Sequence, residues 1–304
     1  MLAHTNARYG RDPVVMFYSH LSDRYAPFST RAISSTVRDA TYVLDGLVDQ
    51  GADLPIEEHY TDTAGFTDHI FALCYLLGFR FAPRIRDLPD KRLYTFHNPK
   101  QYGSLSGLVA GRADTALIQR NWDEMLRVAA SIREGKVSAS LLVSKLAAYP
   151  RQSELALALR ELGRIERTLF TAEWWLRPEL RRRVTIGLNK GELRNSLAKA
   201  LRFYRRGAVA DRSREEQQRK ASGLNLVIAA IGLWNTLYLQ KAIRALADSG
   251  NPVPDHVLSH LSPLGWEHIT FTGLYYWRRH FRSDPEALRS LRPFKLPLAK
   301  AKTA

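Results

Sequence analysis

The chain has 304 residues, of which 45% are hydrophobic, and its 45 Lys and Arg residues outnumber 30 Asp and Glu to give a net charge of +15. This length and apolar content support one large or two smaller folded domains and exclude a mostly disordered chain. The positive charge favours a polyanionic partner, and nucleic acid is the commonest one inside cells, although ribosome-associated proteins and some basic enzymes share such a charge.

The first part of the chain alternates between strand and helix signals. In chain order these are two strands within 14–34, a helix at 36–51, a short strand at 56–63, a helix at 66–77 and a strand at 79–85. Thr36 is the expected N-cap of the first helix and Gly51 its stop. This order predicts an α/β arrangement.

From about residue 112 the apolar spacing becomes helical throughout. The expected helices cover residues 121–135, 138–149, 153–175, 178–207 and 215–250, and a compact aromatic-rich segment follows at 260–277. Linkers are expected near 98–112 and 250–254. The longest apolar run, residues 224–234, is too short to cross a bilayer, and residues 1–13 lack the apolar core of a signal peptide.

Two cysteine-dependent features are not expected, because Cys74 is the only cysteine. A single thiol forms neither a disulfide framework nor a cysteine metal site. Cys74 lies in the apolar helix at 66–77, where a free thiol behaves as a small hydrophobe. A reducing cytoplasm, with no membrane segment, is the expected compartment.

Asp62 is the first candidate for a chemical role, because it stands where the strand at 56–63 ends. In open α/β sheets ligands and metals collect at this edge, and a carboxylate held by rigid backbone suits the octahedral oxygen coordination of Mg²⁺. The alternative is that Asp62 or Thr67 caps the following helix. Asp68 lies in the first helical turn and is explained by its favourable interaction with the helix dipole.

Glu192 is the candidate partner for Asp62, since one carboxylate does not hold two metal ions. It follows Gly191, which leaves room for a ligand, and lies on a helix rich in cations. The alternative is an ordinary exposed helix residue. The cations that are expected to contact DNA backbone are Arg164, Arg167, Lys190, Arg194, Lys199, Arg202, Arg205 and Arg206; the alternative for them is a solvated helix face.

Five long motifs carry a family resemblance. They are YTDTAGFTDHIFALCYLLGFRFAPRIRDL, YPRQSELALALRELGRIERTLF, LNKGELRNSLAKALRFYRRG, DRSREEQQRKASGLNLVIAAIGLWNTLYLQKAI and LSPLGWEHITFTG. From about Asn6 to Phe281 the chain resembles the transposases of replicative class II transposons, the Tn3 family. The resemblance implies an RNase H-like catalytic domain with a long helical insertion and a metal-binding triad of two Asp and one Glu. Asp62 matches the second Asp and Glu192 the Glu, so both acquire a catalytic and metal-binding role.

The resemblance also implies an activity and its partners. The family reaction is Mg²⁺- or Mn²⁺-dependent hydrolysis of a phosphodiester at each transposon end, followed by attack of the 3′-hydroxyl on target DNA. The implied partners are transposon-end inverted-repeat DNA and target DNA, with a homo-oligomer when the protein is full length and no membrane. The implied location is the cytoplasm of bacteria, in association with the nucleoid.

The chain departs from the family pattern at its start. The first Asp of the triad lies on a strand upstream of the segment NARYGRDPVVMFYSHLSD, and Asp12 and Asp23 fall downstream of that position, so neither takes its role. We therefore expect an N-terminally truncated chain that is inactive alone: an RNase H-like mixed sheet lacking its first strand, with a large all-helical insertion and a helical C-terminal part.

The expected division is 1–97 for the partial catalytic core, 98–186 for the helical insertion, 187–250 for the helical segment with the last acid, and 251–304 for the C-terminal segment and tail. Two other functions stay open. One is a non-catalytic DNA-binding or oligomerising remnant of a transposase, and the other is an independent metal nuclease with an unrecognised third acid.

Overall fold

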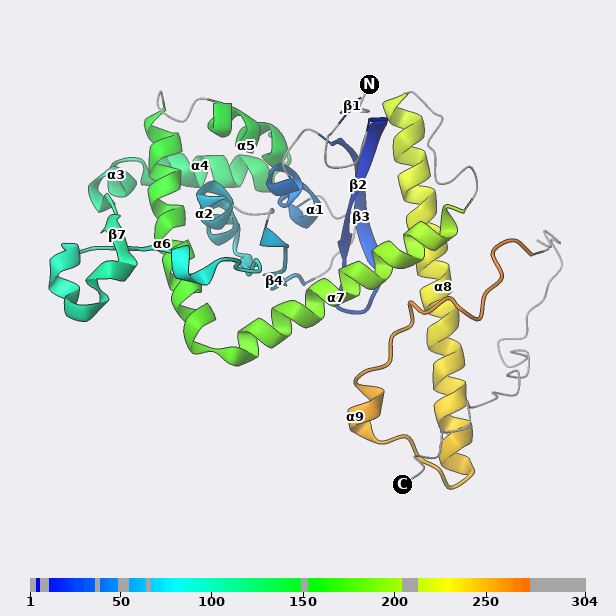
Figure 1. Ribbon diagram of the computed structural model, residues 1–304. Coiled ribbons are helices and arrows are strands. Elements are labelled where there is room, and N and C mark those ends of the chain that lie inside the picture. The colour runs from blue at the N-terminus through cyan, green and yellow to red at the C-terminus, as the bar shows by residue number, and fades with distance from the viewer. Residues whose placement is uncertain are drawn as a thin grey trace.

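The computed structural model describes residues 4–5, 11–35, 39–48, 55–63, 67–148, 153–203 and 213–273. Figure 1 shows small β-sheets surrounded by helices, of which the three longest, α6, α7 and α8, follow one another in the chain. The coarse prediction of a mixed α/β fold is confirmed.

An antiparallel hairpin opens the described structure. β2 (Pro13–Leu21) pairs with β3 (Pro27–Ser34), so the two strands predicted within 14–34 are confirmed. The turn between them contains Tyr25, whose φ of 64° is left-handed. β1 (His4–Thr5) pairs only with the first two residues of β2.

The helix predicted at 36–51 is replaced by two short pieces, the 3₁₀ turn η1 (Asp39–Tyr42) and α1 (Asp45–Val48). The continuous helix was therefore a wrong prediction, and its expected cap Thr36 and stop Gly51 lie outside the described residues. Tertiary hydrogen bonds give the reason. The carbonyl of Val43 bonds to the ring of His20 at 3.0 Å, and this partner comes from β2 and not from the helix itself.

A parallel β–α–β unit follows. β4 (Glu58–His59) and β5 (Arg80–Phe81) pair in parallel, and α2 (Asp68–Leu77) connects them, as predicted. The hydroxyl of Thr67 caps α2 by accepting from the Ile70 amide, and Gly78 ends it at a left-handed φ of 84°. Cys74 is buried inside the core on α2.

A second pair of strands lies where a linker was expected. After the 3₁₀ turn η3 (Leu88–Asp90), β6 (Leu93–Thr95) pairs in parallel with β7 (Val109–Arg112), and the 3₁₀ segment η4 (Pro99–Leu108) connects them. Residues 98–112 are thus mostly ordered secondary structure, and the sheet joins the two sides of the expected boundary at residue 97.

Helices make up most of the remaining described structure, which ends in turns at residues 259–273. They are α3 (Thr115–Arg120), α4 (Trp122–Arg133), α5 (Ala139–Ala148), α6 (Glu154–Leu176), α7 (Pro178–Leu201), α8 (Arg214–Asp248) and α9 (Asp255–Leu258). α7 runs without a break past residue 187, and α6 packs closely on α2. The main core forms around α2 and α6, and a small separate cluster joins α7 to α8 through Leu197, Ala198, Ile228 and Leu264.

In Figure 1 the first part of α8 lies along β3 and close to α7, and its second part extends beyond the other long helices. Its apolar side chains include exposed Leu226 (72% exposed) and Leu233 (63% exposed). Within the described residues it is long and apolar enough to cross a membrane by length and composition, with a mean hydropathy of 1.4 over its most apolar window. The apolar character therefore extends beyond the run at 224–234, but one such helix is weak evidence for a membrane span.

Candidate functional site

Asp62 lies at the carboxyl end of β4, where its position in the sequence predicted it. The ladder to the neighbouring strand continues past β4, because the Arg84 amide donates to the Thr61 carbonyl at 2.8 Å. The exposed Asp62 carboxylate accepts from the backbone amide of Thr63 at 2.7 Å. Thr67, and not Asp62, is the N-cap of α2.

The face of β4 that carries Glu58 and Tyr60 meets α7. The Glu58 carboxylate accepts from Arg183 at 2.8 and 3.1 Å and from the Tyr60 hydroxyl at 2.6 Å, and Arg80 of β5 lies 3.2 Å away. Burial opposes the charge of Glu58, but these donors outweigh it and hold its pKa below the ordinary value. Burial and the bond to Glu58 raise the pKa of Tyr60 to about 12. A partly buried charge network therefore links α7 to β4.

Glycines set the approach of α7 to this strand. A β-carbon on Gly187 would lie 2.3 Å from the Tyr60 ring, so only glycine permits this contact. One turn further on, a β-carbon on Gly191 would meet no atom within 4 Å. Glu192 follows on the exposed surface of α7. The described residues hold no group of three or more His, Cys, Asp or Glu side chains arranged to bind a metal ion.

Two of the predicted DNA-contacting cations on α7 make contacts within the protein. The Lys190 ammonium donates to the Asp23 carbonyl at 2.8 Å and lies 4.8 Å from the centre of the Tyr25 ring. Arg194 is 5% exposed, its guanidinium bonds to the side chain of Asn225 on α8, and burial lowers its pKa to about 10. Lys199 and Arg202 are exposed, and Arg205 and Arg206 lie outside the described residues.

Arg164 and Arg167 of α6 are also engaged. Arg164 bonds to Glu161 at 2.5 Å, and the Arg167 guanidinium lies 3.2 Å from the Asp68 carboxylate. Both guanidinium groups stack over the ring of Tyr94, at 4.3 and 5.6 Å from its centre. These arginines therefore join α6 to α2 and β6, and Asp68 has an ion-pair role in addition to its place in the first turn.

Two histidines, buried His20 and partly buried His59, connect β2 to β4. The rings of His20 and His59 lie 5.3 Å apart, centre to centre. Burial lowers the pKa of His20 to about 4 and that of His59 to about 3, so both are neutral at pH 7. Among the described residues the His59 Nε2 atom has no hydrogen-bond partner.

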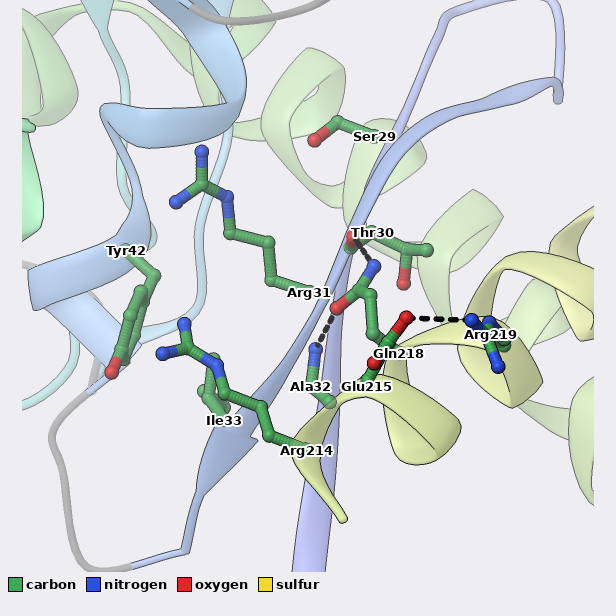
Figure 2. Close-up of a pocket in the computed structure, with 10 residues that line it drawn as sticks. All are labelled: Ser29, Thr30, Arg31, Ala32, Ile33, Tyr42, Arg214, Glu215, Gln218 and Arg219. Carbon is green, nitrogen blue, oxygen red and sulfur yellow. Dashed lines mark hydrogen bonds and ion pairs between the residues drawn. The ribbon is translucent and has the colours of Figure 1, made fainter. Parts of the chain in front are cut away.

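A pocket between β3 and the start of α8 lies apart from these residues. Figure 2 shows the amide of Gln218 reaching from α8 to the backbone of β3, where it accepts from the Ala32 amide and donates to the Thr30 carbonyl, both at 2.8 Å. Arg31, Arg214 and Arg219 also line the pocket, and neither Asp62 nor Glu192 does.

Comparison with known proteins gives a family match and close relatives. The family model described as the Tn3 transposase DDE domain matches residues 1–275. The chain is 57% identical over 289 residues to the transposase for transposon Tn501 of Pseudomonas aeruginosa, covering 95% of this chain and 29% of the relative. It is 55% identical over 292 residues to the transposase for transposon Tn21 of Escherichia coli, covering 96% and 30%.

A more distant relative is the transposase for transposon gamma-delta of Escherichia coli (strain K12), at 37% identity over 272 residues, covering 89% of this chain and 27% of the relative. The chain thus spans less than a third of the length of the relatives it matches. The resemblance inferred from the five sequence motifs is confirmed.

Proposed function

Because the chain belongs to the Tn3 transposase family through its DDE domain, we propose that it contributes the Asp62 and Glu192 carboxylates of a transposase active site. The observation that carries this proposal is the close approach of α7, the helix of Glu192, to β4, the strand that leads to Asp62. The reaction is hydrolysis of a phosphodiester at the transposon ends, followed by strand transfer to target DNA.

The order of contacts along α7 supports bringing the two acids together. Arg183 contacts Glu58, and one helical turn later Gly187 contacts Tyr60. Four helical residues advance about 6 Å and two strand residues about 6.6 Å, so helix and strand progress at a similar rate. The next step of the same progression leads to Gly191 on the helix and to Asp62 on the strand, and Glu192 is the residue that follows Gly191.

Carboxylate oxygens and open space are what a Mg²⁺ or Mn²⁺ site requires. Both acidic residues are exposed, and no atom lies within 4 Å of the β-carbon position of Gly191. The two side chains therefore fit a divalent ion, which they would hold beside the scissile phosphodiester. When bound, such an ion stabilises the charge that develops on the phosphate oxygens. A third acid completes the family triad, and neither Asp12 nor Asp23 takes that role in this proposal.

The finer fold proposal is an RNase H-like sheet in which the β2–β3 hairpin and the β4–β5 pair are two parts of one sheet. The contact between His20 of β2 and His59 of β4 supports it. Beyond Val14, the edge of β2 that faces away from β3 has no partner strand among the described residues. A strand that carries the first Asp of the triad would pair along this open edge of β2.

We retain the four-part division of the chain and the partners as proposals. The proposed boundaries at residues 97 and 187 mark a change of function and not a break in the structure. The β6–β7 pair spans the boundary at 97, and α7 continues through the boundary at 187. The partners are transposon-end inverted repeats, target DNA and further copies of the full-length protein, in the bacterial cytoplasm, with no membrane partner.

The proposal is tested by metal binding, followed with Mn²⁺ by electron paramagnetic resonance. Asp62→Asn and Glu192→Gln are each expected to weaken binding, because each removes a ligand charge. The matched controls are Asp123→Asn and Glu179→Gln, which neutralise exposed acids in the first turns of α4 and α7. Equal binding by all five proteins would contradict the assignment.

Nicking of supercoiled DNA, assayed in parallel, tests catalysis by the chain itself. We expect no nicking from this chain alone, because only two acids of the triad are assigned. The exposed cations Lys199 and Arg202 favour one second function, a non-catalytic DNA-binding remnant. Salt-sensitive DNA binding without Mn²⁺ binding would support that alternative, whereas nicking that Asp62→Asn abolishes would support an independent nuclease.

A further inference from the structure

We propose that Arg84 binds a DNA backbone phosphate directly beside Asp62, an assignment that rests on the proposed function of Asp62. Arg84 is exposed and follows β5, and none of the sequence motifs singles it out for DNA contact. Its position in the sheet, and not its charge alone, carries the inference.

The hydrogen-bond ladder fixes Arg84 as the neighbour of Asp62. β4 and β5 pair with Glu58 opposite Arg80 and His59 opposite Phe81. The ladder then continues in steps of two, with amide-to-carbonyl bonds of 2.9, 2.9 and 2.8 Å from Arg80 to Glu57, from Ala82 to His59 and from Arg84 to Thr61. The same register sets Arg84 opposite Asp62, with the two backbones about 4.8 Å apart.

Both side chains share the face of the sheet that meets α7. Side chains alternate along a strand, so Asp62 lies on the face of Glu58, and Arg84 lies on the face of Arg80. Arg84 is exposed between buried Pro83 and Ile85, as is Arg80 on the same face, whereas Ala82 between these two arginines is buried.

The two cross-strand pairs on this face differ in one respect. Arg80 lies 3.2 Å from Glu58 and 2.5 Å from Glu173, so its charge is satisfied by carboxylates. Within the described part of the chain, Arg84 makes no ion pair or side-chain hydrogen bond, and the Asp62 carboxylate bonds to its own neighbour Thr63. Asp62 and Arg84 are therefore adjacent and both available to other ligands.

A phosphodiester fits such a pair when a divalent ion is held by Asp62. The planar guanidinium would donate two parallel hydrogen bonds to the two non-bridging oxygens of the phosphodiester, a geometry that lysine does not reproduce, and an ion held by Asp62 would add positive charge beside the same phosphate. Arg84 would thus position the phosphate, and it would also contact DNA when no metal is present.

The test measures, by fluorescence anisotropy, how tightly the protein binds a fluorescein-labelled DNA duplex of about 30 base pairs. The titrations contain EDTA and are repeated over a series of salt concentrations. Each phosphate contact contributes about 0.9 to the slope of log affinity against log salt concentration. Arg84→Ala is compared with Arg120→Ala, which removes an equal charge from the exposed end of α3, where the described residues give it no ion-pair partner. We expect Arg84→Ala to reduce the slope by about 0.9 and Arg120→Ala to leave it unchanged. Arg84→Lys should keep the slope but bind more weakly than the wild type.

Melting curves of each variant confirm that the fold is intact, which is expected because the exposed Arg84 side chain makes no ion pair or hydrogen bond within the described residues. Equal slopes for Arg84→Ala and Arg120→Ala, or a wild-type chain that does not bind the duplex at any salt concentration, would overturn the proposal. These measurements contain no metal, so they are independent of the Mn²⁺ titrations that test Asp62 and Glu192.

Discussion

Replacement of Gly163 by alanine should destabilise the protein, although alanine is the better helix former. Gly163 lies on α6 where that helix crosses the start of α2, and a β-carbon there would be 1.7 Å from the carbonyl oxygen of Asp68. Real β-carbons essentially never approach closer than 3.0 Å. The helices must therefore separate by about 1.3 Å, the difference between these two distances.

Such a shift weakens contacts on both sides of Gly163. A gap of about 0.5–1 Å already forfeits a quarter to a half of each dispersion contact, and the packing of Phe71 on Phe170 lies in this interface. Overpacking costs about 1–3 kcal/mol or more, whereas the helix propensity of alanine returns only about 1 kcal/mol. Because the clash is with backbone, we take the upper overpacking cost of about 3 kcal/mol and expect a net loss of about 2 kcal/mol. For a chain of 304 residues this corresponds to a melting temperature lower by about 3 °C.

The assay is thermal and urea unfolding followed by far-ultraviolet circular dichroism. Gly223→Ala is the matched control, because it makes the same change within α8 where a β-carbon would meet no atom within 4 Å. This control should gain about 0.5–1 kcal/mol of unfolding free energy. A Gly163→Ala protein that melts at or above the wild-type temperature would refute the reasoning.

Three further changes test other contacts. Gln218→Ala should lower the unfolding free energy by about 1–3 kcal/mol in urea titrations, because it leaves the Ala32 amide and the Thr30 carbonyl without their partner. Gln218→Glu keeps an acceptor for the Ala32 amide, so its unfolding free energy should fall by less. His20 and His59 have lowered pKa values when folded, so the unfolded chain binds more protons below pH 6.5, and stability should be constant above that pH and fall towards pH 4. His59→Phe should flatten this fall in unfolding curves recorded between pH 4 and 8. Thr67→Ala removes the cap of α2 and should cost about 1 kcal/mol by the same urea assay.

Local signals made part of the fold predictable. The β2–β3 hairpin consists of β-forming residues on both sides of a polar turn, and α2 is an apolar run bounded by Thr67 and Gly78. Residues 36–51 show the limit of such signals. Their apolar spacing is helical, but the ring of His20 binds the carbonyl of Val43, and periodicity within a segment contains no information about a partner on another strand.

Candidate site residues could be proposed only where position or a long motif identified them. Asp62 could be placed at a strand end from local pattern, whereas Glu192 became a candidate catalytic residue through the family resemblance. A positive charge in the sequence did not by itself predict that a side chain would be exposed. Arg194 lies on the face of α7 that packs against α8, and this face is known only once the neighbouring helix is in place. Nothing in the sequence near Gly187 predicted that α7 would pack against the ring of Tyr60 at this residue.

The side-chain amide of Gln218 has a consequence for how the isolated chain would self-associate. An unprotected outer strand is a template for pairing with another molecule and promotes aggregation. Gln218 occupies both a donor and an acceptor of β3, and α8 covers that border of the hairpin. Any intermolecular strand addition to the hairpin is thereby directed to β2, so charged or proline substitutions meant to improve solubility belong on that strand.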